Sequence, residues 1–214
     1  MEIHAPEKPI HSKKEFFFHM FTVVLGILIA LGLEGMVQWV HHRALVREAR
    51  ENIRVEIEKN KEIIDGAMPE LKQRSETLNH MIDSIRQLAK THHAVKGGQV
   101  FFSISNHDLY STAWQTASTS GAVTYMSYDE LRRYTDVYLT QQTYSTLQAQ
   151  ALDRAIDLGS LVQATILVDE VKNIPKDRIQ AIAREAYRQM ILQNTLEDVS
   201  KELRKGYGEL LKRR

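Results

Sequence analysis

Hydrophobic and polar positions divide the chain into one apolar run near its start and a series of amphipathic segments behind it. Residues 16–40, FFFHMFTVVLGILIALGLEGMVQWV, contain no Asp, Glu, Lys or Arg before Glu34. A helix rises about 1.5 Å per residue, so this run is long enough for the roughly 30 Å hydrocarbon core of a bilayer. It predicts one transmembrane helix, with an interfacial tail over residues 1–15 and an extramembrane domain over residues 41–214.

Small and polar residues recur at every fourth position of this run, at Thr22, Gly26, Ala30, Glu34 and Gln38. That spacing places them on one stripe of a helix. Small residues let two helix backbones approach, and a carboxyl group in an apolar zone normally requires a protein partner. The stripe predicts a packing surface for a second copy or for another membrane protein. In the alternative, Glu34 reaches water past Gly35 and the glycines are only tolerated.

The flanks of the run indicate where the helix enters and leaves the bilayer. Ser12 and Glu15 form a capping box, which predicts a helix start near Lys13. The apolar stretch is longer than the about 7–15 residues of a cleaved signal, and no small-x-small cleavage site follows, so we expect a retained anchor. The membrane-interface residues at its exit are Trp39, His41, His42 and Arg43.

The next segment, residues 41–90, repeats apolar residues at intervals of seven, at Ile57, Ile64, Leu71, Leu78 and Ile85. The companion positions are Ile53, Asn60, Ala67, Arg74, Met81 and Leu88, which are only partly apolar. This pattern favours a bundle helix over a strict coiled coil. We expect it to leave the membrane without a linker, and we expect a kink or a short break at Gly66 and Pro69.

The middle of the chain predicts a connection and a short helix. Gly97 and Gly98 interrupt residues 92–106, where VFFSIS is expected as a short extended piece packed on the bundle. Asp108 is expected to cap a helix over residues 109–120, which ends at Gly121 because glycine adopts the left-handed conformation at low cost.

Two long helices follow. Ser127 and Glu130 form a capping box that opens the first, which is expected to reach about Lys172, and the second covers residues 178–211 after a turn that contains Pro175. The buried side of the first is predicted at Leu131, Tyr134, Tyr138, Tyr144, Leu147, Ala151, Leu158, Leu161 and Val162. That of the second is predicted at Ile179, Ile182, Ala186, Met190, Leu196, Val199 and Leu203. Long helices with short turns favour an all-α fold, in which the transmembrane helix continues into an antiparallel helical bundle.

Composition excludes several function classes. The formal charge is +1, with acids and bases mixed throughout, which argues against a nucleic-acid partner. The chain has no cysteine and no Glu-x-x-His, Gly-x-Ser-x-Gly, phosphate-binding or dinucleotide-binding glycine motif. We therefore expect a protein that is not an enzyme and that holds no cofactor.

Histidine is the remaining metal-ligand candidate. His41 and His42 are adjacent, and either could serve as a haem ligand at a membrane surface. Neighbouring residues of a helix point about 100° apart, so the pair is poorly placed to hold one ion. We interpret the histidines as polar interface and loop residues, with no metal site.

Aromatic residues gather over residues 110–144, and four of them are candidates for a partner or ligand surface: Tyr110, Trp114, Tyr128 and Tyr134. At helical spacing such residues usually form core, with their hydroxyl groups at the surface. The alternative is a ligand pocket or protein interface between the short helix and the long one.

The GILIAL run, the HHR triplet at its exit and the motif WQTASTSGAVTYMSYDELRRY together resemble a family of uncharacterised bacterial single-span membrane proteins. The residues that carry the motif here are Trp114, Gly121, Leu131 and Tyr134. The resemblance implies a membrane anchor with a helical domain and brings no activity, cofactor or catalytic residue.

These patterns lead to a functional hypothesis. We expect a structural or accessory subunit of a bacterial membrane complex that docks through its transmembrane helix. The alternative is a membrane-anchored ligand sensor, whose output domain a partner would have to supply because the N-terminal tail is short. We expect the inner membrane as location and a periplasmic C-terminal domain, since short lysine-bearing tails are usually retained and long domains translocate largely regardless of charge.

Overall fold

The computed structural model describes residues 13–91, 106–168 and 174–212, and all of the elements in these ranges are helical. They are α1 (Lys13–Thr91), α2 (Thr112–Thr119), the 3₁₀ helix η1 (Ala122–Tyr125), α3 (Tyr128–Val168) and α4 (Lys176–Lys212). The chain divides into two compact units, Met1–Glu48 and Ala49–Arg214. The predicted all-α fold is confirmed.

Helix α1 begins at Lys13, as predicted, and one uninterrupted helix carries both the apolar run and the first bundle segment. Of the kink or short break expected at Gly66 and Pro69, the break is absent, because the helix continues through both residues. Proline removes one helical hydrogen bond. Pro69 is exposed, so the helix carries it on the solvent side, while buried Ile64 and Leu71 hold the opposite side.

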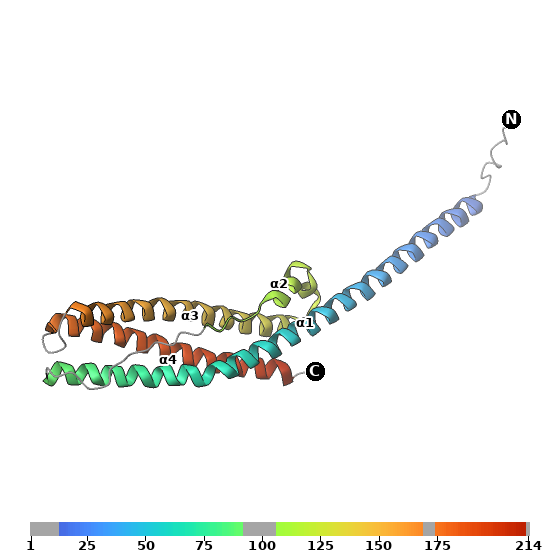
Figure 1. Ribbon diagram of the computed structural model, residues 1–214. Coiled ribbons are helices and arrows are strands. Elements are labelled where there is room, and N and C mark those ends of the chain that lie inside the picture. Colours follow the sequence, from blue (N-terminus) through green and yellow to red (C-terminus); the bar gives the residue numbers. More distant parts are fainter. Residues whose placement is uncertain (1–12, 92–105, 169–173, 213–214) are drawn as a thin grey trace, which may run out of the picture. The chain divides into compact units, whose positions relative to one another are not determined.

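The second unit is a bundle of three long helices: the later part of α1, α3 and α4 (Figure 1). Helices α1 and α3 run in the same direction, because Asn60 pairs with Gln141 and Leu78 packs with Leu158 further along both. Helix α4 runs antiparallel to both.

The heptad residues of α1 form the core of this unit. Ile53, Ile57, Ile64, Ala67, Leu71 and Leu78 are at most 2% exposed. Each fully buried large aliphatic side chain contributes roughly 1.5–3 kcal/mol relative to exposure. A cluster at the far end of the helices joins Leu78, Met81, Ile82, Leu158 and Ala186. The period of seven therefore correctly predicts which face of α1 is buried.

The ends of the shorter elements differ in part from prediction. Gly121 has a φ of 77°, in the left-handed region, as expected for the residue that ends α2. Asp108 does not cap α2: the helix starts at Thr112, and Asp108 instead accepts a hydrogen bond of 2.7 Å from Asn106. At α3, the Glu130 amide donates to the Ser127 hydroxyl at 3.3 Å, which is one half of the predicted capping box. The predicted VFFSIS piece and the end of α3 near Lys172 lie outside the described residues.

Candidate functional site

Segment 106–111 contacts both α1 and α3 and is held by side-chain amides from the two helices. Asn60 accepts a hydrogen bond from the Tyr110 amide at 2.8 Å and donates to the Tyr110 carbonyl at 2.7 Å. Gln141 donates to the same carbonyl at 2.8 Å. Both side chains are buried, and their amides do for this backbone what a neighbouring strand does in a sheet.

The hydrogen bonds of Asn60 and Gln141 continue to α4, so this polar network joins the three long helices of the bundle. Gln141 Oε1 accepts hydrogen bonds from Asn60 at 3.2 Å and from the Tyr207 hydroxyl at 2.8 Å, so α1, α3 and α4 meet at one amide group. Tyr207 is fully buried. A buried polar group costs free energy unless it is hydrogen-bonded. In this network each buried polar side chain forms a hydrogen bond with another.

Glu56 supplies the cap of α2 from a different helix. The residue is 8% exposed, and its carboxylate accepts hydrogen bonds from the amides of Ala113 at 2.7 Å and Trp114 at 3.4 Å. It also accepts one from the Tyr138 hydroxyl at 2.6 Å. The first amides of a helix lack intrahelical partners, and a negative charge there also complements the helix dipole. Because the N-cap residue of α2, Ser111, makes no side-chain cap bond, Glu56 performs that role.

A second set of hydrogen-bonded polar residues, centred on Gln148, holds the start of the same segment. The Tyr144 hydroxyl donates to Gln148 Oε1 at 2.8 Å, and the same oxygen accepts from the His107 amide at 3.2 Å. The Gln148 amide donates to Asn106, and the His107 ring lies 3.2 Å from Glu70. Desolvation raises the pKa of Tyr144 to about 12, and it also raises the pKa values of Tyr138 and Tyr207 above the usual range for tyrosine.

The four aromatic residues proposed as a partner or ligand surface do not form one cluster. Trp114 stacks on Tyr138 with ring centroids 5.2 Å apart and contacts Tyr134 at 6.1 Å. The Tyr110 ring lies under the ammonium group of Lys59 at 4.9 Å, and Tyr128 is 77% exposed at the start of α3. The structure thus brings together only Trp114 and Tyr134 of the four, and Tyr138 of α3 joins them by stacking on Trp114.

Beside Trp114, a groove of about 420 Å³ separates the segment 109–115 from α3. The residues that line it are Leu109, Ser111, Trp114, Gln115, Thr135, Tyr138, Leu139, Gln141, Gln142 and Ser145, none of which is charged. Its volume falls within the roughly 300–1,000 Å³ typical of small-molecule pockets.

Two other grooves of the bundle are charged. One, of about 450 Å³, is lined by Arg50, Arg54 and Arg133 together with Glu51 and Glu130. Arg50 binds Glu130 through two hydrogen bonds of 2.7 Å, and this carboxylate raises the pKa of the guanidinium. The cationic groups are therefore at least partly neutralised within the groove.

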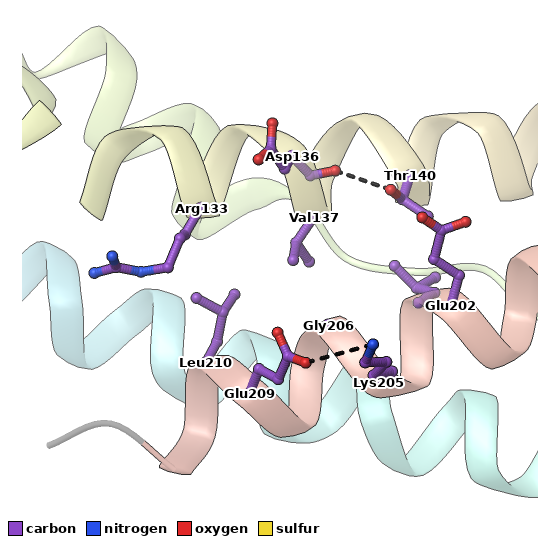
Figure 2. Close-up of a pocket in the computed structure, with 10 residues that line it drawn as sticks. Arg133, Asp136, Val137, Thr140, Glu202, Lys205, Gly206, Glu209 and Leu210 are labelled. Carbon is purple, nitrogen blue, oxygen red and sulfur yellow. Dashed lines mark hydrogen bonds and ion pairs between the residues drawn. The ribbon is translucent and has the colours of Figure 1, made fainter. Parts of the chain in front are cut away.

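The smaller charged groove, of about 230 Å³, lies between α3 and α4 (Figure 2). Three carboxylates and two cations line it: Asp136, Glu202 and Glu209 with Arg133 and Lys205. At its base, a Cβ atom added to Gly206 would lie 3.0 Å from Val137 Cγ2, so the glycine allows the two helices to approach. Mixed charges around a shallow groove are typical of a solvated surface.

In the apolar part of α1, the predicted packing stripe is exposed. Gln38 donates a hydrogen bond of 3.3 Å to Glu34, and the Thr22 hydroxyl donates to the carbonyl of Phe18 at 2.9 Å. No atom would lie within 4 Å of a Cβ at Gly26, and Ala30 is exposed. This part of α1 is long and apolar enough to cross a membrane, and none of its most apolar window is buried.

The predicted interface residues lie close to one another in two pairs, Trp39 with Arg43 and His41 with His42. The Arg43 guanidinium lies 4.4 Å from the centre of the Trp39 ring. The rings of His41 and His42 are 6.2 Å apart and tilted by 56°. Across the described ranges, no three His, Asp or Glu side chains are grouped as a metal site would require.

Comparison of the chain with protein-family models, with curated proteins and with solved structures finds no match. The function is therefore argued from the residues themselves.

Proposed function

We propose that this protein is a membrane-anchored accessory or structural subunit without enzymatic activity, which docks onto a partner through one face of its N-terminal helix. The observation that carries the proposal is the Glu34–Gln38 pair in residues 16–40 of α1, which are otherwise apolar and exposed. The bond from Gln38 leaves Glu34 Oε2 without a partner among the described residues. In lipid, an ionisable group in that state is costly, and a neighbouring helix relieves the cost.

The small residues on the same stripe support this role. Ala30 lies about one turn before Glu34 and Gly26 about two turns before it, where they allow a second helix backbone to approach. Packing between membrane helices depends on such close contact, because lipid tails offer no hydrophobic driving force for association. The partner is either a second copy or another membrane protein, and the proposed location is the bacterial inner membrane with the bundle in the periplasm.

The test is replacement of Glu34 by leucine in the full-length chain, followed by mass determination after extraction in mild detergent. The matched control is Met36→Leu, which lies about 160° away around the helix. We expect Glu34→Leu to lower the mass of the assembly while the helical content is unchanged, and Met36→Leu to preserve both. An assembly of unchanged mass in Glu34→Leu would contradict the proposal.

Ligand sensing is a second candidate, favoured by the uncharged groove beside Trp114. A ligand that binds only the folded state raises its melting temperature. Sensing therefore requires that an uncharged metabolite stabilise the full-length chain and that Trp114→Ala abolish the effect. A screen of such metabolites without any shift in melting temperature would remove support for this role.

A further inference from the structure

Outside the apolar run of α1, the two longest runs without Asp, Glu, Lys or Arg lie in the bundle unit, although these residues make up 26% of the sequence. The first is residues 109–128, which include α2 and η1, and the second is residues 137–152 of α3. The groove beside Trp114 is lined by residues of both runs, so the two meet on one side of the bundle.

Part of this region is exposed. We use the term uncharged surface for six exposed residues of this region: Gln115, Leu139, Gln142, Thr143, Thr146 and Gln150. Leu139 is 56% exposed, which is high for a large aliphatic side chain. Positions 139, 143, 146 and 150 follow the alternating spacing of four and three by which one helix packs along another. Asp136 and Asp153 mark the ends of the stripe.

The absence of charge distinguishes this surface from the neighbouring ones. The two charged grooves described above carry five charged side chains each. Depletion of charged residues marks the core of protein interfaces better than hydrophobicity does. A surface without charges also offers nothing to attract a charged partner.

We propose that the uncharged surface packs against the same surface of a second copy of this chain. In a two-fold contact the same patch is used on both subunits, so a charge close to the axis would face its own copy. A surface without charges avoids this repulsion and is complementary to itself. Leu139 of each copy then gains apolar contact, and the amide and hydroxyl groups around it can pair across the contact.

The size of the surface indicates how the contact is sustained. The stripe from residue 139 to residue 150 is about 17 Å long, and on a helix about 10 Å across it covers far less area than the about 800 Å² per partner of a stable interface. Anchoring both copies in one membrane raises their effective concentration and makes a small contact sufficient. In this respect the inference rests on the proposed function.

The absence of cysteine from the chain permits a direct test by disulfide cross-linking. Thr146→Cys places one thiol at the middle of the uncharged surface, and Thr195→Cys on α4 is its matched control. Both threonines are exposed, and each donates a hydrogen bond of 2.9 Å to the carbonyl four residues earlier. The full-length variants are oxidised in membranes and separated without reductant.

We expect Thr146→Cys to form a covalent dimer several-fold more efficiently than Thr195→Cys. Gln142→Glu in the Thr146→Cys background introduces two like charges at the contact and is expected to reduce the dimer several-fold, whereas Gln73→Glu, at an exposed position of α1, leaves it unchanged. Equal yields at residues 146 and 195, no dimer, or a cross-link to a different protein would each overturn the inference.

The two proposals fail in different ways. If detergent extraction yields a homo-oligomer whose mass depends on Glu34 but Thr146→Cys does not cross-link, this inference is wrong and the proposed function stands. If Thr146→Cys cross-links and the Glu34→Leu change alters neither the mass nor the dimer yield, the contact on the bundle exists and the membrane face is not the docking surface.

Discussion

Asn60 and Tyr110 exchange two hydrogen bonds, one from the Tyr110 amide to Asn60 Oδ1 at 2.8 Å and one from Asn60 Nδ2 to the Tyr110 carbonyl at 2.7 Å. Both bonds join a helix core position to the backbone of a segment fifty residues away. Asn60 is fully buried, so water cannot replace Tyr110 as the hydrogen-bond partner of its side-chain amide. The pair fixes the register in which the segment 106–111 returns along the bundle.

Replacing Asn60 by alanine is expected to lower the free energy of unfolding by about 2 kcal/mol, because it removes a fully buried partner and leaves the Tyr110 amide without its acceptor. The control is Asn194→Ala: Asn194 is exposed and accepts one hydrogen bond of 3.0 Å from Ser75. We expect that change to cost less than about 0.5 kcal/mol. The free energy of unfolding of both variants is measured by urea titration, followed by circular dichroism. An equal loss of stability in the two variants would contradict a special role for Asn60.

Glu56 is expected to hold α2 on the bundle. Glu56→Ala removes the acceptor of three hydrogen bonds. A hydrogen bond to a charged acceptor contributes about 1.5–3 kcal/mol. We therefore expect α2 to detach locally from the bundle. The measurement is the emission of Trp114 in a Trp39→Phe background, where Trp114 is the remaining tryptophan. We expect a red shift in Glu56→Ala and faster exchange of the Ala113 and Trp114 amides.

The control for this experiment is Glu62→Ala, an exposed glutamate on the same helix. It should leave both the emission and the exchange rates unchanged. A Trp114 spectrum in Glu56→Ala identical to that of the control would show that α2 is held by its apolar contacts instead.

The buried tyrosines make the bundle sensitive to alkaline pH. The pKa of Tyr144 is about 12 in the folded chain and about 10 in an unfolded one. Above pH 10 the unfolded state binds fewer protons than the folded state, so stability is fully present below pH 10 and is lost as the pH rises to about 12. A difference of about two pKa units corresponds to about 2–3 kcal/mol for this residue. Tyr138 and Tyr207, whose pKa values are also raised, add to the loss.

This dependence is measured as the urea midpoint at pH 8 and pH 11, with tyrosinate absorbance recorded in parallel. Tyr144→Phe removes one of the titrating groups and should reduce the difference between the two pH values. A midpoint that does not fall between pH 8 and pH 11 would contradict the burial of these hydroxyl groups.

Two glycines of α4 provide a paired test of helix packing. Gly208→Ala is expected to stabilise the protein by about 0.5–1 kcal/mol, because alanine is the better helix former and no atom lies within 4 Å of the added Cβ. Gly206→Ala gains the same propensity but places its Cβ 3.0 Å from Val137, so it should stabilise less than Gly208→Ala or destabilise. Thermal unfolding of the two variants compares them, and equal stabilisation would show that Val137 yields without cost.

The sequence by itself determined the helices and the buried face of the first bundle segment. A period of seven placed Ile57, Ile64, Leu71 and Leu78 on one side of α1, and the helix geometry that fixes this is local. The apolar run of α1 and the left-handed Gly121 were readable for the same reason, since each depends on a residue and its near neighbours.

Only the tertiary structure decided which polar groups are buried and what satisfies them. Periodicity placed Asn60 on the inner face of α1, but its partner is a backbone fifty residues away. The cap of α2 was predicted from the nearest aspartate, Asp108, and is instead Glu56, whose selection depends on how α1 and α2 dock. The uninterrupted helix through Pro69 has the same origin, because packing of the residues around it outweighs the local cost of proline. Local propensity is a property of the sequence, whereas these contacts exist only once the helices are assembled.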